Sequence, residues 1–539
     1  MTDEGRTVKP DAPEPGRGVT LDYWDPEDSG FWERSGSAIA RRNLWVSIPN
    51  LLCGFAVWLY WSIIIVQMQN LHALGFFSFA ADKSLLYTLP AIAGLAGATL
   101  RIPNSFMIAI SGGRNVIFVT SLLLVAPALG VGLALQDMGT PWLTFAALAA
   151  MSGVGGGAFA SSMSNISFFF PKRVQGTSLG LNAGLGNLGV SVMQVLLPFV
   201  MTFGLFGALG GGSRTLPPEL GGKDVWIQNC GLIWVPILLA VAVAAFFFMN
   251  NLPRHNVPAT PLAVSKMLWL ELLGFAGAAL GIVLLVSDWG AFPEMAKILL
   301  VLLVAVVTTL LLMRFLTPRA TKENLVGQFS IFRDKHNWVM TWLYTMTFGS
   351  FIGYSAAFPK LIQDVFGTLP DGSLNPGAPN PLHYAWLGPL VGSLIRPIGG
   401  WLSDKLGGAR VTQWNTVLMI GSALAVAYFV QVARTASRPE IYWWPFLGLF
   451  LLLFATTGIG NGSTFRMIPI IFKPAKAGPV LGWTSAIAAY GAFLIPRIFG
   501  TQIQAGHAEY ALYGFSVYYL SCLGVNWWFY ARKNAEIPC

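Results

Sequence analysis

The sequence predicts an all-α polytopic membrane protein, and three observations support this fold class. Of the 539 residues, 54% are hydrophobic and only 11% are charged, whereas about 25% charged residues are usual in a soluble domain. Apolar runs long enough to cross a hydrocarbon layer of ~30 Å recur along the whole chain. Two sets of these runs, one in each half of the chain, also share ordered motifs, which indicates an internal repeat.

The apolar runs predict fourteen membrane spans, arranged as six, two and six. We expect the spans at about 44–67, 84–110, 115–135, 142–170, 174–201, 229–250, 267–287, 296–316, 338–361, 381–403, 411–433, 442–472, 478–501 and 510–531. The predicted parts are an N-terminal tail (1–43), a six-helix bundle (44–250), a linker with two extra transmembrane helices (251–337), a second six-helix bundle (338–531) and a C-terminal tail (532–539).

The basic residues of the short loops predict the orientation. One side of the membrane carries most of them, namely Arg114, Lys172, Arg173, Arg254, Arg319, Lys322, Arg333, Lys335, Lys405, Arg410, Lys473, Lys476, Arg532 and Lys533. The other side has Lys83, Arg214, Lys223, Arg434 and Arg438. The positive-inside rule therefore places both termini in the cytoplasm, and we expect the protein in the cell (inner) membrane. The net charge of +9 needs no nucleic-acid partner, and the polar N-terminal tail does not resemble a cleavable signal peptide.

Two arginines lie inside apolar spans at matching places in the two halves. The stretch RIPNSFMIAISGGR (101–114) is echoed by RPIGGWLSDKLGGAR (396–410), with a proline within two residues of each arginine and a Gly-Gly pair at +11 and +12. At ~1.5 Å per helical residue, each arginine lies about 17 Å from its glycine pair, near the middle of the membrane. A guanidinium there needs a partner. We expect an anion; the alternative is that each arginine bonds to helix carbonyls or tyrosines.

Further alignments extend the repeat. AFASSMSNISFFFPK (158–172) aligns on GNGSTFRMIPIIFKP (460–474), and LGLNAGLGNLG (179–189) on LGWTSAIAAYG (481–491). Parallel repeats of this kind place a substrate at the midplane between the halves, so Arg101 and Arg396 should face one cavity. The two middle spans have no counterpart in either half, and we expect them to be an insertion outside the transport core.

Other titratable groups are absent from the predicted bundle middle. The carboxylates lie in loops, at span ends or in the inserted pair, where we expect Glu271 near the cytoplasmic end, and none of the five histidines falls mid-span. Nothing there is placed to shuttle protons. The four cysteines have no metal-ligand spacing, so we expect no metal and no cofactor. The chain has no visible haem, molybdenum or iron–sulfur ligand set, which argues against an enzyme that reduces its substrate.

Glycine-rich runs in the spans predict close helix packing. Gly176, Gly180, Gly184, Gly186 and Gly189 line one such run, and GVGGG (153–157) and GIGNG (458–462) form two more. No GK[ST] follows them, so they are not phosphate loops. Asn187 inside the first run has a carboxamide that can donate to an oxyanion.

The stretch GGWLSDKLGGAR (399–410) resembles the loop motif of the major facilitator superfamily, through Gly400, Leu402, Asp404, Gly407 and Arg410. The glycines permit tight packing, and Asp404 can cap a helix or pair with a base in one state only. We expect these residues, with Arg114 in the equivalent place of the first half, to form a gate that does not touch substrate.

Ordered motifs along the tail and the twelve core spans resemble the nitrate/nitrite porter family, within a major facilitator fold of two six-helix bundles related by pseudo-two-fold symmetry. The motifs are WDPEDSGFWERSGSAIARRNLW, GATLRIPNSF, FASSMSNISFFFPK, LGLNAGLGNLGVSVMQ, TFGSFIGYSAAF and SAIAAYGAFLIP. More narrowly, they are similar to the bacterial nitrate/nitrite antiporters. This chain departs from the family in its inserted pair and in Ala489–Tyr490, where close relatives are glycine-rich.

The resemblance implies roles for particular residues. Arg101 and Arg396 would grip a planar anion, Tyr344 would donate its hydroxyl, and the rings of Phe159, Phe348 and Phe55 would sandwich the anion. The first nitrate signature of the family falls on Ala183, Gly184 and Asn187, and the second on Gly482 and Ser485.

We therefore expect a transporter that exchanges nitrate (in) for nitrite (out) by alternating access, works as a monomer and has the lipid bilayer as its surroundings. Small planar anions suit planar guanidinium groups and flat aromatic walls. The alternatives are a proton-coupled nitrate symporter of the same family and a non-transporting membrane sensor.

Overall fold

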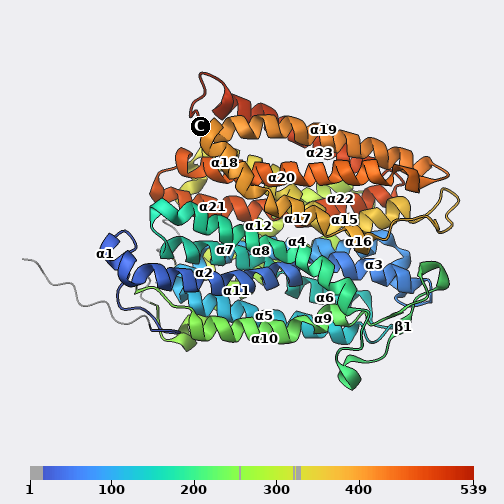
Figure 1. The fold of residues 1–539 in the computed structure, drawn as a ribbon, viewed down its shortest axis with the longest axis horizontal. Coiled ribbons are helices and arrows are strands. Elements are labelled where there is room, and N and C mark those ends of the chain that lie inside the picture. The colour runs from blue at the N-terminus through green and yellow to red at the C-terminus, as the bar shows by residue number, and fades with distance from the viewer. Residues whose placement is uncertain (1–15, 254–256, 320–321, 323–328) are drawn as a thin grey trace, which may run out of the picture.

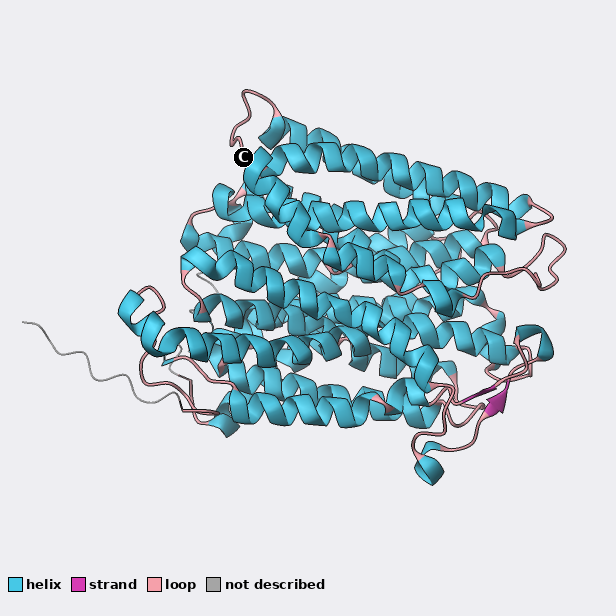
Figure 2. Ribbon diagram, viewed as in Figure 1, coloured by secondary structure: helices cyan, strands magenta, loops and turns pink. Residues whose placement is uncertain are grey.

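The computed structural model describes residues 16–253, 257–319, 322 and 329–539. Long helices run side by side along one axis and make up nearly the whole of this part of the chain (Figures 1 and 2). The exception is a two-stranded antiparallel pair, β1 (Arg214–Thr215) and β2 (Asp224–Val225), in a loop at one end of the bundle. The all-α prediction is thereby confirmed.

The helices follow the predicted order. The first set comprises α1 (Ser29–Phe31), α2 (Ser37–Leu59), α3 (Trp61–His72), α4 (Lys83–Ser111), α5 (Gly113–Ala134), α6 (Trp142–Ser152), α7 (Val154–Phe169), α8 (Lys172–Val200), α9 (Asn229–Leu232) and α10 (Trp234–Phe248). The inserted pair is α11 (Thr260–Val286) and α12 (Glu294–Leu316). The second set comprises α14 (Lys335–Tyr344), α15 (Ser350–Phe366), α16 (Pro381–Tyr384), α17 (Leu387–Leu394), α18 (Arg396–Leu406), α19 (Gly408–Thr435), α20 (Trp443–Ile471), α21 (Pro474–Ala488), α22 (Gly491–Gln504) and α23 (Glu509–Asn526).

Eleven helical segments among the described residues are long and apolar enough to cross a membrane. Three more helical stretches coincide with other predicted spans: α14 to α15, α16 to α18, and α23 with the π-helical turn Trp527–Ala531. The π-helical turn Thr345–Gly349 joins α14 to α15. Such insertions are frequent at functional sites because they rotate side chains out of the regular register. The structure is compatible with fourteen spans, and that number and the domain boundaries stay predictions.

The first span begins earlier than the predicted 44. Helical structure starts at Ser29, where the Asp28 carboxylate accepts hydrogen bonds from the N–H groups of Gly30 and Phe31 at 3.0 and 3.3 Å. The buried Phe31 ring lies edge-on to Trp24, with 5.3 Å between ring centroids. Trp24 in turn lies edge-on to Phe169 of α7, with 5.2 Å between ring centroids, and its Nε1 donates to the Phe168 carbonyl at 3.1 Å. The described part of the predicted tail therefore packs on the bundle through its aromatic residues. Residues 1–15 lie outside the described part.

The C-terminus and α1 lie at the same end of the bundle (Figure 1). There, the N–H of Ala409 donates to the Cys539 carbonyl at 3.0 Å. We call the opposite end, where α4 begins and α15 ends, the distal end.

The inserted pair packs directly on α4, the helix that carries Arg101. A Cβ atom on Gly274 of α11 would lie 2.9 Å from Leu100 and 3.0 Å from Pro103. The structure also corrects the expected place of Glu271. Because α11 begins at Thr260, seven residues before the predicted span, Glu271 lies well inside the helix and is buried.

Glycines make the closest helix contacts, as predicted for GVGGG. A Cβ on Gly155 would lie 2.1 Å from the Gly54 carbonyl oxygen, and one on Gly189 would lie 2.2 Å from the Leu52 carbonyl oxygen. The expectation of close packing is wrong for Gly180 and Gly184, where no atom lies within 4 Å of the Cβ position. Those two glycines border open space.

The glycine contacts give a prediction for stability. A Cβ on Gly353 would lie 2.4 Å from the Gly491 carbonyl oxygen, so Gly353→Ala must separate α15 from α22. Overpacking costs about 1–3 kcal/mol, and we expect a lower Tm for the purified protein in detergent. The control is Gly448→Ala, also inside a helix, where no atom lies within 4 Å. A Tm of Gly353→Ala equal to or above that of Gly448→Ala would contradict this contact.

Candidate functional site

Arg101 lies deep between the two sets of helices and is fully buried. Its Nε donates to the Gly156 carbonyl of α7 at 3.0 Å, and its Nη1 donates to the Ser485 carbonyl of α21 at 3.1 Å. The remaining nitrogen, Nη2, is buried and has no hydrogen-bond partner among the described residues. Bonding to helix carbonyls, the alternative raised by the sequence, thus accounts for part of this guanidinium and leaves one of its nitrogens free.

Arg396 begins α18 in the second set of helices and is also buried. Two of its nitrogens, Nε and Nη2, are buried without a hydrogen-bond partner among the described residues. Neither this guanidinium nor that of Arg101 forms an ion pair in the described part of the chain. Unpaired buried N–H groups are costly, and each needs an acceptor.

The Phe348 ring lies between the two arginines. The guanidinium carbon of Arg101 is 5.2 Å from the centroid of this ring, and that of Arg396 is 5.7 Å from it. Phe348 belongs to the π-helical turn, and its ring stacks on Phe159 at 5.8 Å with 23° between the ring planes. The structure therefore brings together both arginines and two of the three predicted aromatic residues around one ring.

Phe55 is one ring further away. It contacts Phe159 edge-on at 5.9 Å, and neither of the two guanidinium groups lies over its ring. Because the Phe55 ring is fully buried and packs against the Phe159 ring, it helps to fix the orientation of Phe159.

Tyr344 also belongs to this cluster, since its ring stacks on Phe348 at 5.8 Å. The Tyr344 hydroxyl donates to the Asn461 side-chain oxygen at 3.3 Å. The Asn461 amide nitrogen is buried without a partner among the described residues. Asn461 therefore adds a free N–H donor of the same kind as those of the arginines.

The two signature regions occupy different positions. In the first, the Asn187 amide donates back to the Ala183 carbonyl at 2.6 Å, its side-chain oxygen is buried without a described partner, and Gly184 borders open space. In the second, Ser485 receives the Arg101 bond on its carbonyl, and a Cβ on Gly482 would lie 3.2 Å from the Ser105 hydroxyl. The second signature region therefore contacts the Arg101 side chain, whereas the first region borders open space.

Three residues of the cluster were not predicted. Trp58 lies under the Arg101 guanidinium at 5.6 Å, Phe351 lies under that of Arg396 at 4.3 Å, and Asn461 holds Tyr344. The repeat contained the signal for Asn461, because the alignment of 158–172 on 460–474 matches it with Phe159. The two rings carry no such signal, since each is one of many aromatic residues in apolar spans.

The predicted gate residues lie at the end of the bundle near the termini. Asp404 forms an ion pair with Arg466 of α20, while Gly407 and Gly112 have φ of +90° and +79°, which favours glycine. Gly400 borders open space, and Arg410 is exposed. Arg114 differs from its counterpart: it is buried and donates to the side-chain oxygens of Asn115 and Thr260.

Ionic and polar contacts join the two sets of helices at the distal end. Lys83 of α4 lies 3.2 Å from the Asp364 carboxylate of α15, which Lys360 also contacts at 2.5 Å. Beside them, the Gln363 amide donates to the Asn70 side-chain oxygen of α3 at 2.7 Å. These groups bridge the two sets of helices at the distal end, and we expect them to hold that end closed.

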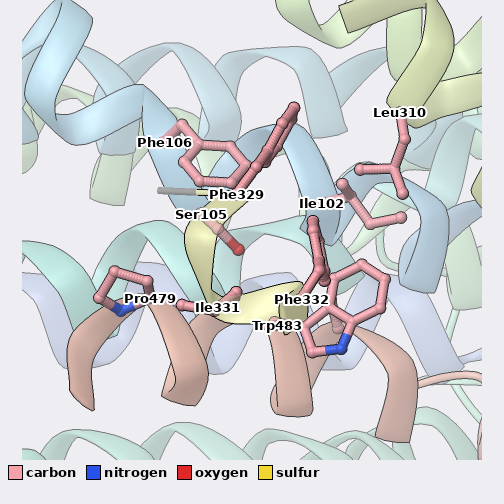
Figure 3. Close-up of a pocket in the computed structure, with 10 residues that line it drawn as sticks. Ile102, Ser105, Phe106, Leu310, Phe329, Ile331, Phe332, Pro479 and Trp483 are labelled. Carbon is pink, nitrogen blue, oxygen red and sulfur yellow. The ribbon is translucent and has the colours of Figure 1, made fainter. Parts of the chain in front are cut away.

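An apolar pocket lies beside the arginine cluster, between α4, α12, the turn Phe329–Arg333 and α21 (Figure 3). It is lined by Ile102, Ser105, Phe106, Leu310, Phe329, Ile331, Phe332, Pro479, Trp483 and Ala486. None of these side chains is charged, so this pocket is distinct from the arginine cluster. The described residues also contain no group of three or more His, Cys, Asp or Glu side chains that could hold a metal ion.

Comparisons with known proteins agree with this architecture. Residues 46–496 match the Major Facilitator Superfamily. A Thermus thermophilus protein named "Probable nitrate/nitrite antiporter NarK2" is 38% identical, over 97% of this chain and 99% of its own length. The nitrate/nitrite transporter NarU of Escherichia coli strain K12 is 34% identical, over 95% of this chain and 96% of its own length.

Solved structures support the same fold. The xylose transporter XylE from E. coli superposes with a TM-score of 0.53 at 14% identity, covering 91% of this chain and 97% of that one. A bacterial homologue of the human drug peptide transporters PepT1 and PepT2 gives 0.56 at 12% identity, covering 90% and 97%. The fold, with its buried site between two helical sets, thus defines a polytopic membrane transporter of the major facilitator class. Within the Major Facilitator Superfamily, the chain belongs to the family of the nitrate/nitrite transporters.

The distal contacts predict how the closed end responds to charge removal. Asp364→Asn removes the anion shared by Lys83 and Lys360, which leaves two unpaired cations, that of Lys360 fully buried. In a Ser355→Cys background, we expect about tenfold faster labelling of that buried cysteine by a membrane-impermeant maleimide added from the distal side. Asp371→Asn is the matched control, because Asp371 is exposed and accepts hydrogen bonds only from Ser373 among the described residues. Equal labelling of both variants would show that the ion pairs do not hold this end closed.

Proposed function

We propose that this protein exchanges nitrate (in) for nitrite (out) across the cell membrane by alternating access, with the anion held between Arg101 and Arg396. One observation carries this proposal: two buried guanidinium groups, one from each set of helices, keep N–H donors without a partner among the described residues and lie 5.2 and 5.7 Å from the centroid of the same aromatic ring. The family membership and the names of the relatives support nitrate and nitrite as the substrates.

The chemistry of the cluster suits a small planar anion. A guanidinium presents its donors in one plane and can form two parallel bonds to the oxygens of a planar anion. The stacked rings of Phe159, Phe348 and Tyr344 supply flat walls. The free amide of Asn461 offers one further donor.

Exchange follows from the charges of the site. With one monoanion bound, the two arginines leave an excess of one positive charge, and without it they leave two. As the site closes and loses water, two unpaired like charges repel more strongly. The empty carrier should therefore change state slowly and the loaded carrier faster, which couples nitrate entry to nitrite exit.

The remaining parts of the proposal concern surroundings and assembly. We place both termini in the cytoplasm and the protein in the inner membrane, because the basic loops gather at the end of the bundle near the termini. One chain contains both arginines, so we propose that a monomer suffices. The arrangement is that of a transporter and not of an enzyme.

A proton-coupled nitrate symporter is the rival proposal, and one observation favours it. The buried Glu271 carboxyl accepts a hydrogen bond from Asn104, three residues after Arg101 on α4. A carboxyl so close to the anion site could accompany the anion with a proton. A non-transporting sensor, the other alternative, would show no flux at all.

Arginine replacement tests the anion site. Arg101→Lys and Arg396→Lys keep the charge but lose the planar pair of donors. Each should lower nitrate exchange in proteoliposomes by about tenfold or more, the loss of one hydrogen bond to a charged group. Arg438→Lys is the matched control, since Arg438 is an exposed distal residue paired with Glu440. Wild-type exchange by either buried variant would refute the two-arginine clamp.

Counterflow separates exchange from symport. Uptake of labelled nitrate into vesicles should require nitrite or nitrate inside and should barely respond to an imposed proton gradient, because the empty site crosses slowly. Vesicles without protein report leakage. Rapid uptake into anion-free vesicles driven by outside acid alone would favour the symporter.

A further inference from the structure

Glu271 is a buried carboxyl in the inserted helix α11, only 2% exposed. Its Oε1 accepts a hydrogen bond from the Asn104 amide at 2.7 Å. Its other oxygen, Oε2, is buried and has no partner among the described residues. The inserted pair therefore places a titratable group against the helix that carries Arg101.

Asn104 connects this carboxyl to the arginine site. It is fully buried and lies almost one helical turn from Arg101, and its amide nitrogen also donates to the Leu100 carbonyl at 3.0 Å. A Cβ on Gly157 of α7 would lie 2.7 Å from this nitrogen. The adjacent Gly156 accepts the Arg101 bond. Asn104 is thus wedged between α11 and the α4–α7 contact that orients Arg101.

No charged residue on the helices around Glu271 forms an ion pair with it in the described part of the chain. On α4, α5 and α12, the helices that pack against α11, and on α11 itself they are Lys83, Arg101, Arg114, Lys266, Glu294, Lys297 and Arg314. Lys83 pairs with Asp364, and Glu294 pairs with Arg497 of α22. The basic groups of Arg114 and Lys297 donate to Thr260 and to the Ser287 carbonyl. Neither Lys266 nor Arg314 forms an ion pair among the described residues, so Glu271 has no counter-charge there.

The hydrogen-bond inventory points to a neutral carboxyl. An ionised carboxylate without a counter-charge is strongly disfavoured in an apolar interior. The Asn104 side-chain oxygen is also buried and lacks a donor among the described residues. A protonated carboxyl supplies the O–H donor that this oxygen needs, while its own carbonyl oxygen keeps the Asn104 N–H bond. Protonation would therefore give a hydrogen-bond partner to both unpaired oxygens, Oε2 of Glu271 and the side-chain oxygen of Asn104.

We propose that Glu271 is a positioning residue for Arg101, and that it acts as a neutral carboxylic acid paired with Asn104. The pair fixes α4 against α11 and α7, so that Arg101 keeps its free nitrogen directed at the anion. The proton stays on Glu271 during exchange. This inference rests on the proposed function, and it makes the inserted helices part of the transport core instead of an appendage.

Two substitutions separate this role from that of a charged group. Glutamine in Glu271→Gln presents one acceptor and one donor, as a protonated carboxyl does, so the KM for nitrate and the maximal rate of exchange should stay within about twofold. Leucine in Glu271→Leu cannot form either hydrogen bond between residue 271 and Asn104. The KM should therefore rise by about tenfold, with a smaller change in maximal rate. Loss of exchange in Glu271→Gln equal to that in Glu271→Leu would overturn the neutral-acid role. Normal KM in Glu271→Leu would overturn the positioning role.

The pH profile gives a readout that a merely structural role would not change. Raising the pH removes the proton, and the resulting carboxylate cannot donate to Asn104. The KM of the wild type should therefore rise at alkaline pH, while that of Glu271→Gln should stay flat by comparison. All other titratable groups are present in both proteins, so their effect on the KM is removed when the two pH profiles are compared. Parallel profiles would overturn the proposal.

Infrared spectroscopy of the full-length protein tests the protonation state without transport. The difference spectrum between wild type and Glu271→Gln at neutral pH should contain the C=O stretch of a protonated carboxylic acid. A carboxylate band in its place would overturn the inference whatever the protein transports. Absence of nitrate exchange by the wild type would instead defeat the proposed function and leave this spectral result standing.

Discussion

The structure depends on one constraint, which is that two guanidinium groups lie in an apolar interior with N–H donors that no described residue satisfies. Arg101 donates to two carbonyls and keeps one free nitrogen, and Arg396 keeps two. The surrounding elements serve this arrangement. Glycine contacts bring α7 close enough for Gly156 to orient Arg101, and the π-helical turn places Phe348 between the arginines. Preorganised donors of this kind are what the proposed anion would require once it has lost its water shell.

Three sets of buried ionisable groups differ in the partners that surround them. The distal Lys360 and Asp364 neutralise each other across one helical turn, with Lys83 added from the other half. Glu271 faces an amide and no cation. Among the described residues, the guanidinium groups of Arg101 and Arg396 have no ionic partner and keep buried N–H groups without an acceptor, which is why we propose them as the binding groups. Counting the charged residues in the spans would not have distinguished these three sets, because they differ only in which groups their side chains contact.

The position of the two inserted helices could not be predicted from the internal repeat. The pair has no counterpart in the repeat, which favoured a place outside the transport core. In the structure, α11 covers α4 beside Leu100 and Pro103, and Glu294 at the start of α12 pairs with Arg497 of α22. The insertion therefore contacts both sets of helices. Symmetry predicts which segments correspond to each other, but it does not predict where an unpaired segment docks.

The sequence by itself determined the fold class and the two arginines, because apolar runs of this length cross a membrane as helices and because each charge inside such a run is conspicuous. The resemblance to a known family added Tyr344, Phe159 and Phe348, which the structure gathers at one ring. Only the tertiary structure decided that Trp58, Phe351 and Asn461 complete the cluster, that residues before 44 pack on the bundle, and that Glu271 meets Asn104. Hydrophobicity and charge are properties of each segment and can be read along the chain. Partners depend on how helices from distant segments rotate and pack against each other, and that is settled by contacts that no single segment contains.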